Sequence, residues 1–266
     1  MDIGTRMKTF YEEASKTKLM KRTPVAIRID GRVFHTFTKE FNKPFDQTLM
    51  SAMQATMKYL CENMQGSVFG YTQSDEITLI LTDYQKLNSS AWFDYEVQKL
   101  CSISASMATM AFNKYFKEIA TTKYERDKNF GAHNQKLLEY SEKLYQTYNS
   151  VFGKAMFDAC YFNIPKEEVT NLIYWRQLDA IRNSIESVAQ QYFKQSELQN
   201  KSQDEIVFML NTQKDVDWFD TYSIPEKRGV CCIKDENGKW FVDLEIPIFK
   251  GDGRDYIERL IYFDKK

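Results

Sequence analysis

The sequence predicts an α+β protein with a ferredoxin-like antiparallel sheet, followed by a helical and β-hairpin C-terminal extension. The main observation is the pattern of apolar residues, which over 24–163 has the order strand–helix–strand–strand–helix–strand. With 266 residues, 43% of them hydrophobic, the chain can bury one generous core or two modest ones. Only 10 glycines and 5 prolines occur, so the composition excludes collagen-like, low-complexity and largely disordered proteins.

The first half of the chain contains most of the expected sheet. The elements expected there are a helix over 4–20 that ends before Pro24, a strand over 25–30, a helix with Asp46 as its N-cap, and strands over 67–71 and 77–81. The polar stretch 72–76 between the last two strands is typical of a hairpin turn. Asp30 therefore ends one expected strand, and Asp75 lies in the turn between two others.

The second half adds helices and a second hairpin. Expected there are a helix with apolar spacing from Phe93 to Phe116, a helical or loop insertion over 121–150, a strand over 155–162, a helix over about 167–192, and a capping box at 202–205. Strands over 230–233 and 240–244 flank Asn237-Gly238, a strong hairpin signal. We expect one domain over 1–266, with a core at about 22–165 and the extension at about 166–266.

Charge and cysteine content exclude several classes of protein. The 36 Lys and Arg nearly balance 37 Asp and Glu, so binding to nucleic acid would require a segregated basic face. The five cysteines form no C-x-x-C motif and only two histidines occur, so we expect reduced thiols and no zinc site. No apolar run approaches the roughly 18 residues of a membrane helix, and the first residues lack the apolar segment of a signal peptide. We expect a cytoplasmic protein without membrane segments.

Three carboxylates form the most informative group of side chains. Asp30 at a strand end and Asp75-Glu76 in a hairpin are expected to meet on one sheet, because the first and third strands of a βαββ unit are neighbours. Three such charges repel one another unless a cation neutralises them, and hard oxygen ligands suit Mg²⁺. The alternative is that D-G and S-D-E are ordinary turns, and composition alone does not decide between the two interpretations.

Three blocks resemble the tRNA-histidine guanylyltransferase family of 3′-to-5′ polymerases. They are R-I-D-G-R-V-F-H at 28–35, Q-S-D-E at 73–76, and Y-W-R-Q-L-D at 174–179 with Asn183 after it. Asn42-Lys43-Pro44 and Phe157-Asp158 extend the resemblance, which covers most of 5–195, and 227–229 is a fainter match. The resemblance implies a polymerase-palm fold.

The resemblance also implies a role for each matching residue. Two Mg²⁺ ions would be held by Asp30, the carbonyl of Gly31 and Asp75, with Glu76 beside them as a catalytic residue. The residues that would bind the incoming nucleotide are Asp30, Gly31, Arg32, Val33, Phe34, His35, Ser74 and Asp75. Lys43 would bind the triphosphate that activates the RNA. Alone, His35 would be read as a packed histidine; within this block we expect it to contact the nucleotide.

The implied reaction adds nucleotides to the 5′ end of tRNA, using ATP for activation and GTP or another nucleoside triphosphate as the added unit. Ile181 stands where the eukaryotic enzymes have the histidine associated with reading the histidine anticodon. The chain therefore looks more like the members that rebuild truncated tRNA 5′ ends on a template. Arg182 and Asn183 are expected to contact RNA, and Lys227 and Arg228 either contact phosphate or form a solvated turn.

The sequence leaves two other functions to consider, and the family resemblance predicts one assembly state. A palm-fold nucleotide cyclase or dinucleotide synthase would use the same carboxylates without RNA. A non-catalytic RNA-binding relative is disfavoured because every carboxylate of the metal site is present. The family resemblance implies a homotetramer, in which basic faces of several subunits combine. We further expect Tyr174 and Trp175 to lie in the core, as aromatic residues of an amphipathic helix commonly do.

Overall fold

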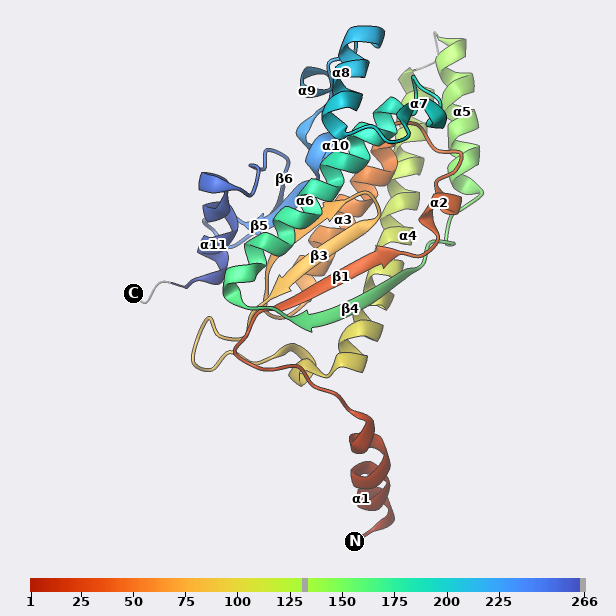
Figure 1. Cartoon of the computed structure of the whole chain (residues 1–266). Helices are drawn as coiled ribbons and strands as arrows, with labels where there is room; N and C mark the ends of the chain where they lie inside the picture. The colour runs from red at the N-terminus through yellow and green to blue at the C-terminus, as the bar shows by residue number, and fades with distance from the viewer. Residues whose placement is uncertain (131–133, 264–266) are drawn as a thin grey trace.

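One antiparallel sheet organises the molecule. The computed structural model describes residues 1–130 and 134–263. Within these residues, six strands pair in the order β4-β1-β3-β2-β5-β6 (Figure 1). The strands are β1 (Val25–Gly31), β2 (Ser67–Gln73), β3 (Glu76–Leu81), β4 (Phe157–Asn163), β5 (Val230–Lys234) and β6 (Trp240–Asp243). The predicted α+β fold is confirmed, and the C-terminal hairpin β5–β6 pairs with β2, so it continues the sheet.

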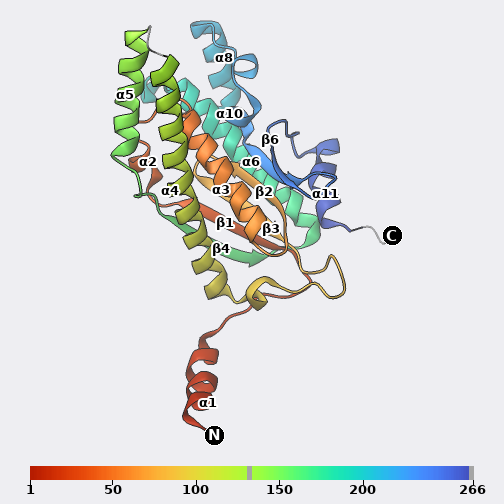
Figure 2. The same ribbon diagram turned by 180° about the vertical axis from the view of Figure 1, so that it is seen from behind.

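α-Helices cover both faces of this sheet. The described α-helices are α1 (Ile3–Met7), α2 (Phe34–Phe37), α3 (Gln47–Asn63), α4 (Val97–Phe130), α5 (Gln135–Asn149), α6 (Lys166–Ala189), α7 (Gln195–Leu198), α8 (Gln203–Lys214), α9 (Trp218–Thr221), α10 (Ile224–Arg228) and α11 (Asp255–Ile261). Helices α3 and α4 cover the back face, as Figure 2 shows, whereas α6 crosses in front of β2 and β3. None of the described helices is long and apolar enough to cross a membrane.

Two apolar layers hold the helices to the sheet. Behind it, Ile27, Ile29 and Leu79 pack with the apolar stripe of α3, in which Met53 and Met57 are buried. In front, a second cluster joins Ile80 and Tyr71 to Ile173 of α6 and Ile257 of α11. Alternate residues of β1 therefore face opposite layers, as expected for a strand that is covered on both sides. Asp30 and Arg28 alternate with the back-facing Ile27 and Ile29, so both lie on the front face.

Helix starts follow the sequence closely. The Asp46 side chain accepts a hydrogen bond from the amide of Leu49, and also one from the hydroxyl of Tyr148, so the predicted N-cap of α3 is confirmed. Ser202 and Glu205 form the predicted capping box of α8. Residues 121–150 are helical in their described part, because α4 continues to Phe130 and α5 packs back against it, with Tyr124 and Tyr145 stacked at 4.5 Å.

The N-terminal segment differs from the expectation. Its helical part begins at Ile3 and ends at Ser15, passing through a π turn and a 3₁₀ turn, instead of reaching residue 20. No residue of this segment is buried, and it projects away from the sheet (Figure 1). The spacing of Met7, Phe10 and Tyr11 predicts a helix correctly, but nothing within residues 1–130 and 134–263 covers that face.

Candidate active site

Carboxylates from three adjacent strands form a row on the front face. Asp30 of β1 lies directly opposite Glu76 of β3 on one side and Asp158 of β4 on the other. Directly opposite residues on one face of an antiparallel pair have Cβ atoms about 4.5–5.5 Å apart. Sequence reasoning therefore placed Asp30 and Glu76 together correctly. Asp158 completes the row. The sequence places it in the expected strand over 155–162, but the pattern alone does not show that this strand pairs with β1.

Asp75 lies at the tip of the β2–β3 hairpin, next to this row. The turn is shorter than predicted: β2 continues through Gln73 and β3 begins at Glu76, which leaves Ser74 and Asp75 as the turn residues. The amide of Gly31 donates a hydrogen bond to the carbonyl of Asp75 at 3.1 Å. This bond fixes the end of β1 against the turn, so the structure brings Asp30, Gly31 and Asp75 together.

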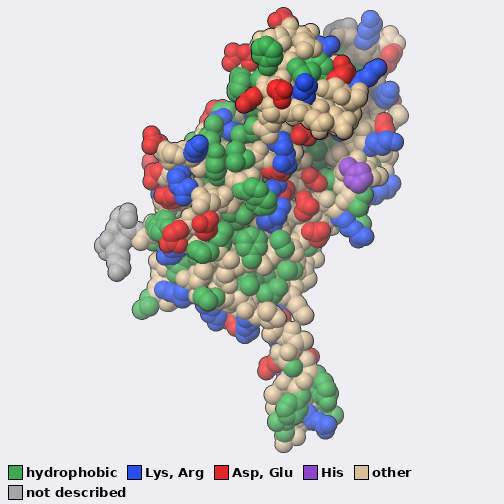
Figure 3. Space-filling model, in the orientation of Figure 1, with side chains coloured by type: hydrophobic (Ala, Val, Ile, Leu, Met, Phe, Trp, Pro, Cys, Tyr) green, Lys and Arg blue, Asp and Glu red, His purple; other side chains and the backbone are tan. Residues whose placement is uncertain are grey.

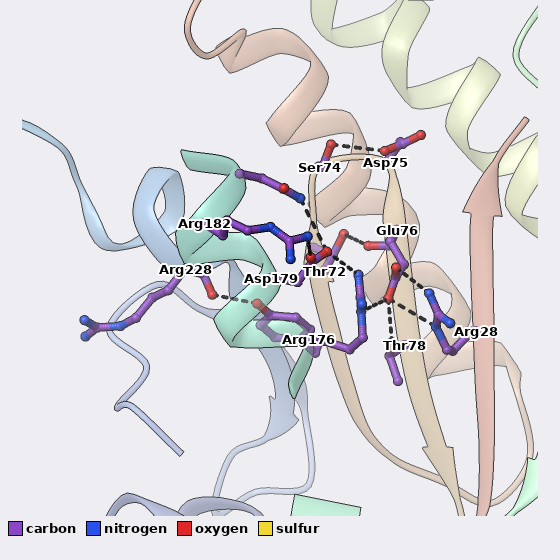
Figure 4. Close-up of polar contacts among 12 residues, drawn as sticks. Arg28, Thr72, Ser74, Asp75, Glu76, Thr78, Arg176, Asp179, Arg182 and Arg228 are labelled. Atoms are coloured by element: carbon purple, nitrogen blue, oxygen red, sulfur yellow. Dashed lines mark hydrogen bonds and ion pairs between the residues drawn. The ribbon is translucent and has the colours of Figure 1, made fainter. Parts of the chain in front are cut away.

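Glu76 has a different environment from the two aspartates. Arg28 donates to its Oε2 at 2.7 Å, Arg176 donates to its Oε1 at 2.7 Å, and the hydroxyl of Thr78 donates to Oε1 at 3.3 Å (Figure 4). The carboxylate is buried, with 7% of the side chain exposed. Two guanidinium groups compensate its charge, so Glu76 is held as the centre of an ion network.

The aspartates lack such compensation. Partial burial raises the pKa of Asp30 to about 6, and the negative charges of Asp75, Glu76 and Asp158 add to the shift. Burial likewise raises the pKa of Asp75, against the opposing hydrogen bonds from its own amide and from Ser74. Burial is the main cause of both shifts, and no basic side chain of the described residues is hydrogen-bonded to either carboxylate. A bound cation would supply compensating positive charge.

The loop after β1 is shaped by close packing. The ring of Phe34 lies so near Gly31 that an added Cβ would be 2.3 Å from it, so only glycine fits. Phe34 is buried against Phe112 and Phe157. Val33 has a φ of 57°, a strained conformation for a β-branched residue that commonly marks functional loops.

Two cavities adjoin this loop and share Ser74. The first, about 350 Å³, is lined by Gly31, Val33, Phe34, His35, Ser74 and Asp75, with Thr38 and Leu49. The second, about 200 Å³, lies between the 38–50 segment and α6 and is lined in part by Lys43, Asn183 and Ser187. Most residues predicted to bind nucleotide therefore line one of two adjacent cavities. Asp30 and Arg32 line neither cavity; Arg32 is exposed, and its amide donates to the carbonyl of Met156.

The residues predicted to contact RNA make contacts within the protein. Arg182 pairs with Asp179, and Asn183 donates to the same carboxylate at 3.4 Å. Lys227 donates to the carbonyl of Phe219, and the Arg228 guanidinium donates to the carbonyl of Ile246 at 2.8 Å. Arg182 keeps about half of its side chain exposed. Their role in RNA binding stays a prediction.

Helix α6 carries residues whose structural role sequence reasoning missed. Arg176 joins Glu76 to Asp179, and Gln177 is fully buried, with hydrogen bonds to the carbonyl of Pro247 and the amide of Phe249. The prediction that Trp175 lies in the core is wrong, because 52% of it is exposed. Its helix turns it toward Arg28 at the uncovered side of the sheet instead. Tyr174 is half-buried against the front cluster.

No three His, Cys, Asp or Glu side chains in the described part of the chain form a metal cluster on their own. The donor set predicted from sequence is different: two carboxylates and a backbone carbonyl. A backbone hydrogen bond joins Gly31 to Asp75, and burial, with the neighbouring negative charges, raises the pKa of both aspartates. Magnesium uses few protein carboxylates and completes its shell with water and phosphate oxygens. The residues present therefore fit Mg²⁺.

Comparison with known proteins identifies the family. The model for the family described as tRNAHis guanylyltransferase matches residues 4–165. The chain belongs to this family. It is thus a nucleotidyltransferase by family, as the R-I-D-G-R-V-F-H and Q-S-D-E blocks predicted.

Solved structures of this family have the same fold. A bacterial tRNA(His) guanylyltransferase-like protein in complex with ATP matches with a TM-score of 0.80 at 39% identity, over 98% of this chain and 100% of that chain. A second such bacterial structure, in complex with GTP, has a TM-score of 0.73 at 37% identity, with the same coverage. The Saccharomyces cerevisiae enzyme, at 18% identity and a TM-score of 0.63, shares the fold over 90% of this chain and 97% of its own.

Two sequence relatives match at lower identity than the bacterial structures. An uncharacterized protein of Acanthamoeba polyphaga mimivirus is 28% identical over 226 residues, which are 81% of this chain and 72% of that protein. The tRNA(His) guanylyltransferase of Schizosaccharomyces pombe is 32% identical over 97 residues, 36% of this chain and 35% of the enzyme. The match to the fission yeast enzyme therefore spans only about a third of its length.

Proposed function

We propose that this protein adds nucleotides to the 5′ end of tRNA in a template-dependent reaction that restores truncated 5′ ends. The observation that carries the proposal is the pair of adjacent cavities that share Ser74 beside the uncompensated aspartates Asp30 and Asp75. A reaction with separate activation and transfer steps needs two nucleotide positions near one catalytic centre. The bacterial family structures named above are complexes with ATP and with GTP.

The proposed chemistry has two steps. In the first, a 5′-phosphate oxygen of the RNA attacks the α-phosphorus of ATP, the bond to the β-phosphate oxygen breaks, and pyrophosphate leaves. In the second, the 3′-hydroxyl of the incoming nucleotide loses its proton and attacks the 5′ phosphorus of the RNA, so that AMP leaves. An RNA with a 5′-triphosphate enters at the second step and releases pyrophosphate.

We assign the metal to Asp30, Asp75 and the Gly31 carbonyl. When bound there, two Mg²⁺ ions would activate the attacking oxygen and stabilise the leaving group. The chain itself orients the reactants: Ser74 offers a hydroxyl at the junction of the two cavities, and Lys43 offers a point charge for phosphate. Glu76 positions the end of β3 through Arg28 and Arg176.

The choice of RNA follows from Ile181. This side chain is half-buried against the cluster formed by α6, α8 and α9. The eukaryotic enzymes have at this position a histidine that can form a hydrogen bond with a base. An aliphatic side chain neither donates nor accepts hydrogen bonds. Selection of RNA would then come from its shape and phosphates and from pairing of the incoming nucleotide with the opposite acceptor strand. This argument favours repair of several tRNAs over addition of a single G to tRNA-histidine.

We infer a homotetramer in the cytoplasm. The N-terminal segment supports assembly because Ile3, Phe10 and Tyr11 are 78%, 56% and 61% exposed; Figure 3 shows hydrophobic side chains gathered at its end. A second subunit would cover such a face. All five cysteines are unpaired thiols, which is typical of a reducing compartment. Sedimentation of the protein, with and without residues 1–20, measures the subunit number directly.

Incubation with 5′-truncated tRNA, labelled nucleoside triphosphates and Mg²⁺ tests the proposed function. We expect 5′ extension that follows the template base on several tRNAs. A cyclic nucleotide or dinucleotide product without tRNA extension would identify the rival cyclase or synthase. A kcat/KM preference of more than about a hundredfold for full-length tRNA-histidine, worth about 2.7 kcal/mol, would contradict the proposed repair role.

A further inference from the structure

The front face of the sheet is only half covered. Helix α6 crosses β2 and β3, whereas β1 and β4 lie beside it (Figure 1). On these two strands Asp158 and Cys160 are exposed, and Asp30 is partly exposed. The uncovered face therefore leads directly to the row of carboxylates, and a substrate larger than a nucleotide can approach the site across it.

One aromatic ring stands at the boundary of this open face. Trp175 of α6 is 52% exposed, and its ring centroid lies 4.5 Å from the Arg176 guanidinium and 5.5 Å from that of Arg28. Arg28 is two residues before Asp30 on the same face of β1, which is a rise of about 7 Å along a strand. The ring is thus close to the carboxylate row without being part of it.

The two arginines hold the ring in place. Both guanidinium groups bind the same carboxylate, that of Glu76, and both lie within cation–π distance of the indole ring. Guanidinium–indole contacts are favourable and fix the ring orientation. An indole that two ion-paired arginines hold in place while 52% of the residue stays exposed is a preorganised stacking surface, since little side-chain entropy remains to be lost on binding.

We propose that Trp175 stacks on the 5′-terminal base of the RNA and thereby positions the 5′ phosphorus beside Asp30 and Asp75. This inference rests on the proposed 5′ addition. Stacking suits an enzyme that accepts several RNAs, because every base has a π-face and stacking is tolerant of sequence.

Intrinsic fluorescence isolates this residue. The other three tryptophans, Trp92, Trp218 and Trp240, are 5–8% exposed, so RNA stacking will be reported by Trp175. We expect 5′-truncated tRNA to quench the emission, and W175F to lose the quenching while it retains most RNA affinity. This binding test needs no catalysis, so its outcome is separate from the failure of 5′ addition itself.

Kinetics with a base-deleted RNA gives the sharper test. We expect W175A to raise KM for RNA about five- to a hundredfold, with KM for the nucleoside triphosphate unchanged. An abasic 5′-terminal nucleotide should raise KM equally in the wild type and add nothing in W175A, because the two changes remove the same contact. Phe208→Ala is the matched control, because Phe208 on α8 is also an exposed aromatic residue (67%, against 52% for Trp175). This variant should leave KM for RNA unchanged.

Three results would overturn the proposal. The first is an unchanged KM for RNA in W175A, and the second is a rise in KM for the nucleoside triphosphate alone. The third is additive losses from W175A and the abasic RNA. A change in subunit number with KM for RNA unchanged would show that a second copy of the chain covers the ring instead. Should W175A fail to fold, W175L keeps an apolar side chain and removes the stacking ring.

Discussion

Asp75 and Glu76 are neighbours in the chain, yet the described arginine side chains compensate the charge of Glu76 and not that of Asp75. Glu76 is buried between Arg28 and Arg176 and receives hydrogen bonds at both oxygens. Asp75, like Asp30 across the sheet, has a raised pKa and no basic side chain bonded to it among the described residues. The difference separates two tasks. A compensated carboxylate holds strands and helix together, whereas an uncompensated pair is available for a cation and for chemistry.

The largest expected effect concerns the uncompensated pair. Asp30→Asn and Asp75→Asn should each lower kcat by about a thousandfold or more, equivalent to about 4 kcal/mol of barrier, because each removes a metal-binding charge. Both variants should keep or gain thermal stability at pH 7, since a repulsive charge is lost. Single-turnover kinetics on 5′-truncated tRNA and a melting curve provide the two readouts. Wild-type rates in either variant would refute the assignment.

The compensated network should show the reverse pattern. Arg176→Met leaves Glu76 and Asp179 without their buried partner, and loss of one member of a buried ion pair costs about 3 kcal/mol or more of unfolding free energy. Urea denaturation measures this loss. Arg182→Met is the matched control, because Arg182 also pairs with Asp179 but is half exposed and should have a much smaller effect. Equal losses in the two variants would contradict the distinction.

The dependence of stability on pH sharpens the comparison. The pKa of Asp30 is about 6 in the folded protein against an ordinary 3.8, so between these values the folded state binds more protons than the unfolded state. The unfolding free energy contributed by this group therefore falls as pH rises through that window. Without Mg²⁺, Asp30→Asn should raise Tm relative to the wild type at pH 7 and lose that advantage near pH 4. An advantage that persists at pH 4 would contradict the pKa shift.

An exposed ion pair should have the smallest effect. Asp94 binds Lys18 and Lys21 at the surface, and these contacts lower its pKa to about 2. Exposed pairs contribute little because water and salt screen them. We expect Asp94→Asn to leave Tm at pH 7 unchanged within error, at low and at high salt. A loss comparable with that of Arg176→Met would mean that burial does not govern these networks.

Much of this arrangement follows from local sequence. The strand that contains Asp30, the N-cap Asp46, the capping box at Ser202 and the Asn237-Gly238 hairpin are all determined by neighbouring residues, and all are confirmed. The convergence of Asp30 with Asp75 follows from the strand order. These features need no knowledge of distant partners.

Other features depend on contacts between distant residues. Arg176 reaches Glu76 from 100 residues away, so nothing near Glu76 in the chain indicates that its charge is compensated. Trp175 has the spacing of a core residue, but α6 covers only part of the sheet and leaves the ring exposed. The pairing of β5 with β2 likewise joins segments that local patterns cannot connect.

The dependence of nucleotide transfer on Mg²⁺ in Asp75→Asn and Glu76→Gln tests the central claim most directly. Adjacent residues are changed isosterically, and rates are measured on 5′-truncated tRNA at a temperature where circular dichroism shows both variants folded. We predict that Glu76→Gln loses stability but keeps the wild-type Mg²⁺ midpoint, whereas Asp75→Asn loses transfer or needs far more Mg²⁺. An equal shift of the Mg²⁺ midpoint in both variants would show that Glu76 is a metal ligand and contradict the account.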